Sequence, residues 1–513
     1  MRAVEYILTA REMQQYDKNT IEHFKVPALV LMEQAALLAM EEIRVCLGRE
    51  KKRILILSGT GNNGGDAMAL ARLLYLNGYD ITVFIVSHCI PEEIKFSREA
   101  AVQYEIIKNM KIPIVTMLPS DSYDMIIDGI FGVGLNREIE GNIRYVIDAV
   151  NHYQAIRLSL DIPSGIDATG GNIYGICFKA DITITFAFFK RGLFLKPGSQ
   201  FAGRVVKKEM GITPMSFLGE LPGMEALCGN VSDYLPARDP EGHKGTFGKI
   251  LVVGGSKEVA GAAYLAGKAA FYSGCGMVRI CIHRAQYEHL FPLLPEAIYD
   301  CYGREEEVEE AVKRGLEWAD AVILGPGMGQ DTMAETLWKL VIEGKKIPLV
   351  IDADGLTILS RQENTKRLRK LQQNADSRRV LVLTPHLLEF SRITGKEKRE
   401  IESKWEELLL EYTDSMKAIL VKKDARTVIC NAQGRMTMNL SGNHGMATAG
   451  SGDVLSGIIG AFLAVFENPY EAVQTAVYFH GRAGDIMAEE KGYHGLMAGE
   501  LLTGMSLILK NHK

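Results

Sequence analysis

Short apolar runs alternate with helix-like segments through the first half of the chain. The run RILILS at 53–58 is apolar on both faces, which is typical of a buried parallel strand. In the next segment, 66–77, apolar residues recur at helical spacing, and Gly78 stands where a helix C-terminal cap belongs. Alternation of strand and helix predicts an α/β fold with a doubly wound parallel sheet. Further strand-like runs lie at 81–86, 125–128, 157–161 and 182–187.

The pattern lapses in the middle of the chain and then restarts. Pro214, Pro222 and Pro236 punctuate a stretch without sustained periodicity, so we expect a linker at 216–235. We therefore predict an N-terminal domain over 1–215 and a second α/β domain over 236–513. The apolar runs of the second domain lie at 249–256, 276–282, 321–329, 348–356, 379–386 and 418–423.

Composition narrows the classes of partner. The 58 Lys and Arg against 63 Asp and Glu give a formal net charge of -5, so we expect no nucleic acid and no membrane surface as a partner. The N-terminus has no apolar core for a signal peptide, and no stretch approaches a membrane span. The eight cysteines form no C-x-x-C pair, which predicts neither a disulfide framework nor a zinc site. A reducing cytoplasm is the expected location.

The glycine-rich string SGTGNNGGDA at 58–67 fits the spacing G-x-G-x-x-G of a dinucleotide-binding loop. That motif also requires an acidic residue at the carboxyl end of the next strand, where it binds ribose. Asp80 precedes the strand at 81–86, so an ordinary dehydrogenase is disfavoured. The loop instead offers backbone N–H groups at a helix start, with amides and a carboxylate beside them. A tight turn capped by Asp66 is the simplest structural alternative.

The string G-x-G-N-N-G-G-D, together with the blocks 128–141 and 160–171, resembles the N-terminal domain of the NAD(P)H-hydrate repair enzymes. The resemblance covers roughly 10–215 and implies a Rossmann-like fold. Enzymes of this kind epimerise reduced nicotinamide to which water has added across the C5=C6 bond. Ala67 stands where a third glycine is common, a departure that we expect to matter little.

The resemblance also implies the residues of this first site. Asp161 would lie against the hydrated ring, where a general acid/base can carry the proton of the hydroxyl that leaves and returns. A potassium ion would bind Asn63, Asp128 and Ser164, and oxygen ligands suit such a hard cation. For Asp128, a strand-end acid that caps a loop is the competing interpretation. The implied substrate contacts are Asn62, Asn63, Gly64, Gly65, Asp66, Gly132, Val133, Gly134, Leu135, Asn136, Arg137, Glu138 and Asp161.

A second glycine-rich string, TAGSGD at 448–453, precedes a long apolar segment. It resembles the anion-hole motif of ribokinase-like kinases, in which backbone N–H groups stabilise a transferring phosphoryl group and an aspartate takes the substrate's hydroxyl proton. Alone, the motif fits a capped buried helix equally well. The blocks at 243–256, 261–280, 325–329, 352–356 and 384–390 resemble successive parts of the ADP-dependent NAD(P)H-hydrate dehydratase.

This second resemblance implies a ribokinase-like domain and a dehydration driven by phosphorylation. Hydroxide is a poor leaving group, so transfer of a phosphoryl group from ADP lets phosphate depart instead, with Asp453 as the base and Gly452 at the phosphoryl group. Magnesium is expected to accompany ADP. The family pattern is altered at Asp424, Ala449, Ser451 and His444. The implied ADP contacts are Lys423, Asp424, Ala425, Arg426, Thr427 and Gly452, and the implied hydrate contacts are Ala262, Gly327, His386 and Asp453.

The two domains in this order resemble a bifunctional repair enzyme that takes hydrated NADH or NADPH, epimerises the R and S hydrates and dehydrates the S hydrate. One alternative is a ribokinase-like small-molecule kinase, for example of a vitamin alcohol, with an accessory Rossmann-like domain. Another is an N-terminal nucleotide-sensing module without catalysis. We expect a homo-oligomer, since apolar helical segments such as 461–466 serve subunit contacts as readily as the core.

Overall fold

The computed structural model describes residues 3–47, 52–87, 94–376 and 378–510, and it divides into two units. The N-terminal unit is Glu5–Met224, and the C-terminal unit is Glu225–Lys513 together with the residues up to Val4. The segment 216–235, expected as a linker, contains strand β10 (Met224–Leu227), which joins the sheet of the C-terminal unit next to β19. Each unit is described by itself.

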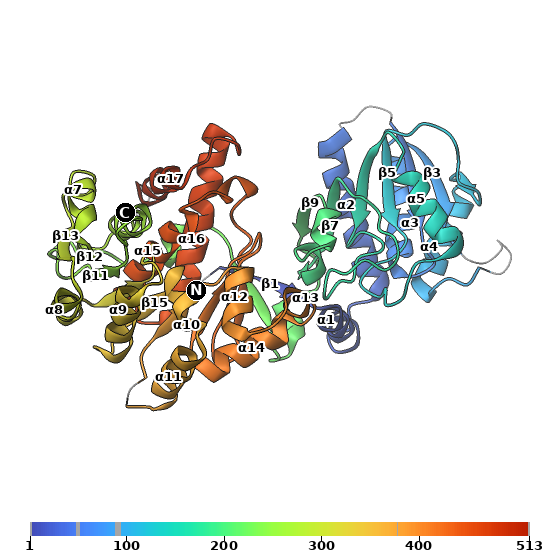
Figure 1. Ribbon diagram of the computed structural model, residues 1–513. Coiled ribbons are helices and arrows are strands. Elements are labelled where there is room, and N and C mark those ends of the chain that lie inside the picture. The colour runs from blue at the N-terminus through green and yellow to red at the C-terminus, as the bar shows by residue number, and fades with distance from the viewer. Residues whose placement is uncertain (1–2, 48–51, 88–93, 377, 511–513) are drawn as a thin grey trace. The chain divides into compact units, whose positions relative to one another are not determined.

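The N-terminal unit is built around a seven-stranded sheet with the order β4-β3-β2-β5-β6-β7-β9, in which every neighbouring pair is parallel (Figure 1). A short parallel pair joins β1 to β8 outside this sheet. The elements are β1 Val4–Leu8, α1 Ala10–Glu22, α2 Ala28–Leu47, β2 Arg53–Ser58, α3 Asn62–Leu76, β3 Asp80–Ile85, α4 Arg98–Asn109, β4 Ile114–Val115, β5 Met125–Gly129, α5 Gly141–Val150, β6 Ile156–Leu160, β7 Ile182–Phe186, β8 Phe189–Lys190 and β9 Arg204–Lys208.

Strand β2 lies at the point where the strand order reverses, with β3 on one side and β5 on the other. Its alternate residues face two different cores. Ile54 and Ile56 pack with α2, α3 and α4, whereas Leu55 and Leu57 pack on the face covered by α5. The run that is apolar on both faces is therefore a buried parallel strand, as the sequence predicted. Ser58 and Gly129 pair at the carboxyl ends of β2 and β5, which is where ligands bind in such sheets.

Helix α3 begins at Asn62, four residues before the predicted start, because an extended Gly61 caps it and the following glycines admit a close approach. A Cβ on Gly64 would lie 2.0 Å from the carbonyl oxygen of Gly59. Ala67, the departure from the family pattern, packs against Gly129, where a Cβ would lie only 2.4 Å from the methyl group of Ala67. The missing third glycine is thus compensated by a glycine on β5.

The C-terminal unit has the strand order β13-β12-β11-β14-β15-β16-β17-β18-β19-β10, parallel from β13 to β17 and antiparallel through β18 and β19 (Figure 1). Its elements are β11 Lys249–Val253, α6 Gly261–Tyr272, β12 Met277–His283, α7 Tyr287–Leu290, β13 Ile298–Tyr302, α8 Glu305–Trp318, β14 Ala321–Leu324, α9 Thr332–Glu343, β15 Leu349–Ile351, α10 Asp354–Leu359, α11 Gln362–Gln373, β16 Leu381–Leu383, α12 Leu387–Thr394, α13 Lys398–Ser403, α14 Trp405–Met416, β17 Ile419–Lys422, β18 Val428–Cys430, β19 Met436–Met438, α15 Ser451–Leu463, α16 Pro469–Lys491 and α17 Ala498–Lys510.

The carboxyl ends of β14, β15, β16 and β17 lie side by side, so the loops that follow them gather at one edge of the sheet. Helix α15 is the central helix of this unit and packs against α6 and α16. Ala461, Phe462 and Leu463 are buried in the core, so most of the segment 461–466 packs inside the unit. The predicted α/β class with two such domains is confirmed.

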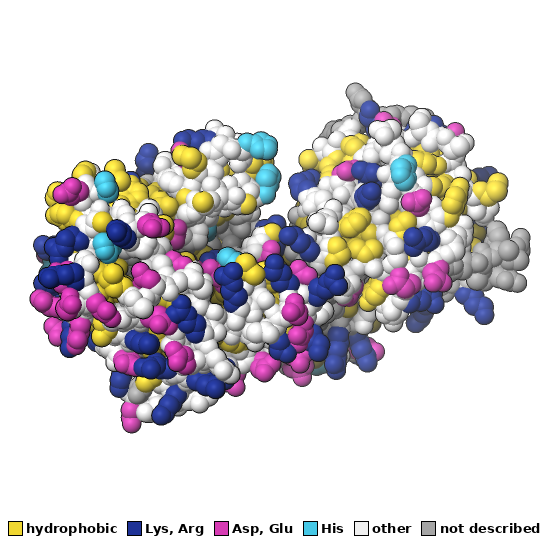
Figure 2. Space-filling model, in the orientation of Figure 1, with side chains coloured by type: hydrophobic (Ala, Val, Ile, Leu, Met, Phe, Trp, Pro, Cys, Tyr) yellow, Lys and Arg dark blue, Asp and Glu magenta, His cyan; other side chains and the backbone are white. Residues whose placement is uncertain are grey.

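The visible surface carries acidic and basic side chains in mixture on both units (Figure 2). Within the described ranges, no helix is both long and apolar enough to cross a bilayer. The seven cysteines that the structure describes are free thiols, and Cys89 lies outside the described residues.

Candidate active sites

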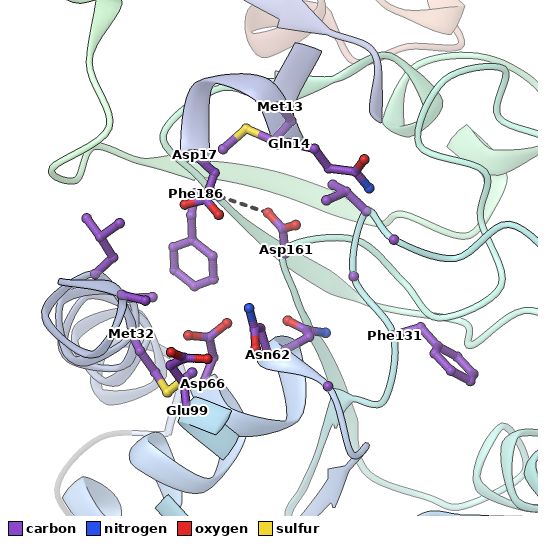
Figure 3. A pocket seen from close by; sticks show the side chains of 18 of the residues that line it. Met13, Gln14, Asp17, Met32, Asn62, Asp66, Glu99, Phe131, Asp161 and Phe186 are labelled. Atoms are coloured by element: carbon purple, nitrogen blue, oxygen red, sulfur yellow. Dashed lines mark hydrogen bonds between the residues drawn. The ribbon is translucent and has the colours of Figure 1, made fainter. Parts of the chain in front are cut away.

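The N-terminal unit contains a cavity of about 620 Å³ beside the carboxyl ends of β2, β5 and β6. Residues from α1, α2, the start of α3 and the loop after β5 line it (Figure 3). Of the residues expected to contact substrate, the lining contains Asn62, Asn63, Asp66, Gly132, Val133, Gly134, Leu135, Asn136, Arg137 and Asp161.

Three of the expected contacts lie outside that lining. Gly64 packs closely against the backbone of Gly59, and Gly65 against Met32. A Cβ on Gly65 would lie 2.4 Å from the terminal methyl group of Met32. The Glu138 carboxylate lies against Gly175, where a Cβ would stand 2.7 Å from its Oε2 atom. These residues shape the walls of the cavity but do not face its interior.

Asp161 follows β6 with a left-handed backbone, at φ +66°, which is unusual for a residue other than glycine and is typical of functional sites. Its carboxylate accepts a short hydrogen bond from the ammonium group of Lys190. Lys190 is fully buried and also donates to Thr185 Oγ1 at 3.0 Å and to the carbonyl oxygen of Phe186 at 2.8 Å. A buried cation therefore fixes the acid at the cavity wall.

Asp17 and Asp66 direct their carboxyl groups into the same cavity (Figure 3). Burial, followed by the charges of Asp161 and Asp17, raises the pKa of Asp66 well above its usual range. Burial likewise raises the pKa of Asp17. Asp66 does not cap α3, because Gly61 is the N-cap and no side chain bonds there. Sequence reasoning missed Asp17 and Lys190, since a polar residue on an amphipathic helix and a lysine after a strand carry no local sign of a site.

Of the residues expected to bind potassium, Asn63 lines this cavity, and Asp128 and Ser164 are buried. Asp128 is fully buried, and its carboxylate accepts hydrogen bonds from Ser164 N at 2.7 Å, Ser164 Oγ at 2.6 Å, Ser159 Oγ at 3.1 Å and Ile130 N at 3.1 Å. Burial nevertheless raises the pKa of Asp128. The amide oxygen of Asn63 is buried and has no hydrogen-bond partner. A buried, unpartnered amide oxygen and a buried carboxylate are ligands of the kind that a hard cation prefers, although Asp128 also caps its loop, as the alternative interpretation expected.

In the C-terminal unit, α15 begins at Ser451 after Gly450 with φ +91°. The N–H groups of Ser451 and Val454 donate to the carbonyl oxygens of Thr448 and Gly450, which leaves those of Gly452 and Asp453 open to an anion. Asp453 lies in that turn. Among the described residues, none donates a hydrogen bond to its carboxylate. Burial, and then the charge of Asp352, raises the pKa of Asp453 to about 7, while Lys423 opposes the shift. This carboxyl group is therefore poised to exchange a proton near neutral pH.

Lys423 lies directly beside this helix start. A Cβ on Gly452 would stand 3.4 Å from its ammonium nitrogen. That nitrogen is 2.7 Å from Asp352 Oδ1, and Ser456 Oγ lies 2.5 Å from Asp352 Oδ2. The structure thus brings together Lys423, Gly452 and Asp453, which the sequence analysis had expected in one site. It adds Asp352 and Ser456. Asp352 follows a buried strand and opens the block 352–356, but neither residue was assigned a role from the sequence.

The residues expected to contact hydrated nicotinamide lie at the same edge. Gly327 adopts φ +61°, and a Cβ there would lie 3.3 Å from that of Ala262. His386 forms a bridge with the backbone of Lys423, while its Nδ1 atom accepts the N–H groups of Leu388 at 3.1 Å and Glu389 at 3.2 Å. The ring therefore caps α12, and burial, with Lys423, lowers its pKa. A half-exposed neutral imidazole is left at the loop edge.

Comparison with known families now links the two sites. A model of the NAD(P)H-hydrate dehydratase family matches residues 250–506, and a model of the YjeF-related N-terminus matches residues 28–192. The bifunctional NAD(P)H-hydrate repair enzyme of Moorella thermoacetica is 34% identical over 99% of this chain and 97% of the relative. The chain belongs to the bifunctional NAD(P)H-hydrate repair enzymes. The vitamin-kinase alternative receives no support from these matches.

Further repair enzymes extend the comparison. That of Thermofilum pendens is 33% identical over 97% of this chain and 95% of the relative. A solved ADP/ATP-dependent NAD(P)H-hydrate dehydratase from Bacillus subtilis, co-crystallised with ATP and Mg²⁺, is 31% identical with a TM-score of 0.47 and covers 55% of this chain and 96% of that one.

The departures from the repair-enzyme pattern mostly have structural accounts. Ser451 Oγ lies 3.3 Å from Nε2 of His480, a buried imidazole whose pKa falls to about 4 through burial. The ring of His444 packs on that of Tyr493, with centroids 4.3 Å apart. Nothing in the structure explains Ala449.

The Asp424 carboxylate interacts with residues of its own turn. Its Oδ1 atom accepts the N–H of Ala425 at 2.7 Å, and its Oδ2 atom lies 3.5 Å from the ammonium nitrogen of Lys422. Nearby, Arg426 donates to the carbonyl oxygen of Leu440 at 2.9 Å. The carboxylate is thus turned toward a neighbouring cation, which reduces its repulsion of a nucleotide phosphate.

Asp424→Gly is therefore expected to leave ADP affinity within about twofold of wild type, because a partly exposed, paired carboxylate contributes little long-range repulsion. Isothermal titration with ADP and Mg²⁺ measures the change. Lys423→Met is the comparison variant, since it removes a cation beside the anion-binding helix start. A gain of tenfold or more in affinity for Asp424→Gly would contradict the pairing as an explanation.

Proposed function

We propose that the N-terminal unit interconverts the two C6 epimers of hydrated NADH and NADPH, and that the C-terminal unit dehydrates the S hydrate with ADP. The observation that carries the proposal is the position of the two predicted acids. Asp161 faces a cavity that also contains the helix start of α3, and Asp453 lies in the first turn of α15 beside a lysine. Each acid thus stands where an anionic nucleotide can be held.

In the first site, Asp161 carries the proton of the C6 hydroxyl group. Its carboxyl group donates a proton as the hydroxyl leaves as water, while the ring nitrogen's lone pair supports the cationic ring. Water then adds to the other face and returns its proton to the carboxylate. The buried Lys190 ammonium holds Asp161 in place during both steps. Asn62, Asn63 and the loop 132–137 supply polar and backbone groups for the rest of the nucleotide.

Asn63, Asp128 and Ser164 would hold a potassium ion at this site. The buried, unpartnered Asn63 oxygen and the buried Asp128 carboxylate support that assignment. When bound, the ion would supply positive charge that offsets the burial of Asp128 and orders the loops carrying Asn63 and Ser164.

Replacing potassium with tetramethylammonium is expected to slow epimerisation by about tenfold or more, which corresponds to about 1.4 kcal/mol of lost stabilisation. The thermal midpoint of the protein should also rise with KCl, since an ion that binds only the folded state stabilises it. An unchanged rate and an unchanged midpoint in potassium-free buffer would count against the site.

In the second site, Asp453 removes the proton of the C6 hydroxyl group, and the oxygen attacks the terminal phosphoryl group of ADP. AMP leaves, and the new C–O bond to phosphate then breaks with help from the ring nitrogen's lone pair. Loss of the C5 proton restores the C5=C6 bond, so the products are NAD(P)H, AMP and inorganic phosphate. The N–H groups at Gly452 and the Lys423 ammonium lie where the phosphoryl group would be held.

Magnesium would accompany ADP, neutralising its phosphates. Within the residues that the structure describes, no group of three or more acidic, histidine or cysteine side chains is arranged to hold a metal ion. With nucleotides, Mg²⁺ is usually held mainly by phosphate oxygens and water.

The deciding experiment supplies mixed hydrate epimers, ADP and Mg²⁺, and follows recovery of reduced nicotinamide by its near-ultraviolet absorbance. Complete recovery with one AMP and one phosphate per molecule is expected from wild type. Consumption of ADP or ATP on another alcohol, without recovery, would favour the small-molecule kinase instead.

The homo-oligomer and the cytoplasmic location remain predictions. Sedimentation velocity of the full chain measures the oligomeric state.

A further inference from the structure

We propose that Asp352 is a positioning residue of the dehydratase site, which holds the Lys423 ammonium at the start of α15 beside Asp453. The inference rests on the proposed dehydratase function and adds to it a residue that orients the phosphoryl-binding lysine. It also assigns Lys423 to the transferring phosphoryl group.

The geometry of Asp352 carries the first step. It directly follows β15, is 1% exposed and accepts hydrogen bonds that include those from Lys423 Nζ at 2.7 Å, Ser456 Oγ at 2.5 Å and Ala353 N at 2.9 Å. Lys423 and Ser456 come from β17's end and from α15, respectively. A single buried carboxylate therefore ties the lysine to the helix whose N-terminus binds the anion.

The position of the lysine carries the second step. Its nitrogen lies 3.4 Å from where a Cβ of Gly452 would stand, so any side chain at 452 would crowd it. The ammonium group is thus presented at the first turn of α15, where the N–H groups of Gly452 and Asp453 are left open while those of Ser451 and Val454 are bonded to Thr448 and Gly450. A cation fixed next to such donors stabilises charge on a transferring phosphoryl group without reorganisation.

The surrounding charges explain how Asp352 also acts on the base. The charges of four groups act on Asp453: the carboxylates of Asp352, Asp354 and Glu389 and the ammonium of Lys423. Burial and Asp352 raise the pKa of Asp453 to about 7, and Lys423 lowers it. Lys423 is paired to Asp352 at 2.7 Å. Loss of Asp352 should therefore lower the pKa of Asp453, and loss of Lys423 should raise it.

The test compares pH profiles of dehydration for Asp352→Asn and Lys423→Met in the full-length protein. Asp352→Asn removes a negative charge and releases the lysine, so the acid limb should move about one unit to lower pH. Lys423→Met removes the positive charge, so the limb should move about one unit to higher pH. Both variants should lose about 10²-fold or more in kcat, as expected for a displaced or missing phosphoryl ligand.

Matched variants separate positioning from folding. Asp300 is 4% exposed and pairs with Arg279 at 2.7 Å on β13, four strands away from β15. Asp300→Asn should lower thermal stability while leaving the acid limb in place. Lys423→Arg, which keeps the charge, should return the limb to the wild-type position and restore part of kcat.

The pH profiles distinguish a positioning role of Asp352 from a purely structural one. Opposite movements of the acid limb in Asp352→Asn and Lys423→Met support the proposal. If Asp352→Asn and Asp300→Asn lose rate equally and the acid limb stays in place in both variants, the proposal is overturned and Asp352 is a structural residue. Failure of the wild type to recover reduced nicotinamide would instead refute the dehydratase function itself.

Discussion

Asp161→Asn is expected to reduce epimerisation by about 10²–10⁴-fold while leaving ADP-dependent dehydration of the S hydrate intact. The amide cannot exchange the hydroxyl proton, yet it keeps the shape of the side chain at the cavity wall. With mixed epimers, recovery of reduced nicotinamide should stop once the S hydrate is consumed. Adding a second protein that carries only the Asp453→Asn change should then complete the recovery, because it supplies the epimerase.

A matched control for this variant lies at the amino ends of the strands, whereas Asp161 lies at their carboxyl ends. Asp181 precedes β7 and accepts the backbone N–H of Arg157 at 2.8 Å. Asp181→Asn removes the same charge from the same unit but leaves the cavity untouched, so epimerisation should continue. Full recovery from mixed epimers by Asp161→Asn alone, in the time needed by wild type, would contradict the assigned role.

Asp453→Asn is expected to abolish dehydration, with a loss of about 10²–10⁴-fold in kcat and epimerisation unchanged. The wild-type pH profile provides a second measurement. Because the base must be ionised, kcat/KM should rise about tenfold per pH unit below the pKa of Asp453 and level off above it. Burial sets that pKa at about 7, so the acid limb should lie near neutrality. An ordinary exposed carboxyl group would give a limb near pH 4.

Asp320 provides the control in this unit, since it precedes β14 and accepts the backbone N–H of Lys249 at 3.0 Å. Asp320→Asn should leave dehydration and its pH profile unchanged. If Asp453→Asn retained more than about a tenth of the wild-type rate, another group would have to take the hydroxyl proton.

The local part of this protein was determined by the sequence alone. Residues 53–58 form a buried parallel strand because their apolar side chains alternate between two cores, and that alternation is visible without neighbours. The glycines of 59–64 mark a tight turn into a helix. A Cβ on Gly64 would lie 2.0 Å from the carbonyl oxygen of Gly59, so only glycine fits there. The order of the two domains follows from motif blocks, each of which is contiguous.

Other features were decided by the tertiary structure. Helix α3 starts at Asn62 and Asp66 does not cap it, because packing of Gly64 and Gly65 fixes the first turn. Strand β10 lies within the expected linker because it gains a partner at the edge of a sheet formed far along the chain.

The same reason applies to the charged groups of both sites. Lys190 bonds to an acid 29 positions earlier, and Lys423 bonds to Asp352 across 71 positions. Residues so far apart leave no periodic pattern in the sequence. The neighbours of each lysine do not indicate which acid it will pair with. The sequence alone therefore determined which loops hold the chemistry, whereas only folding decided which buried charges orient it.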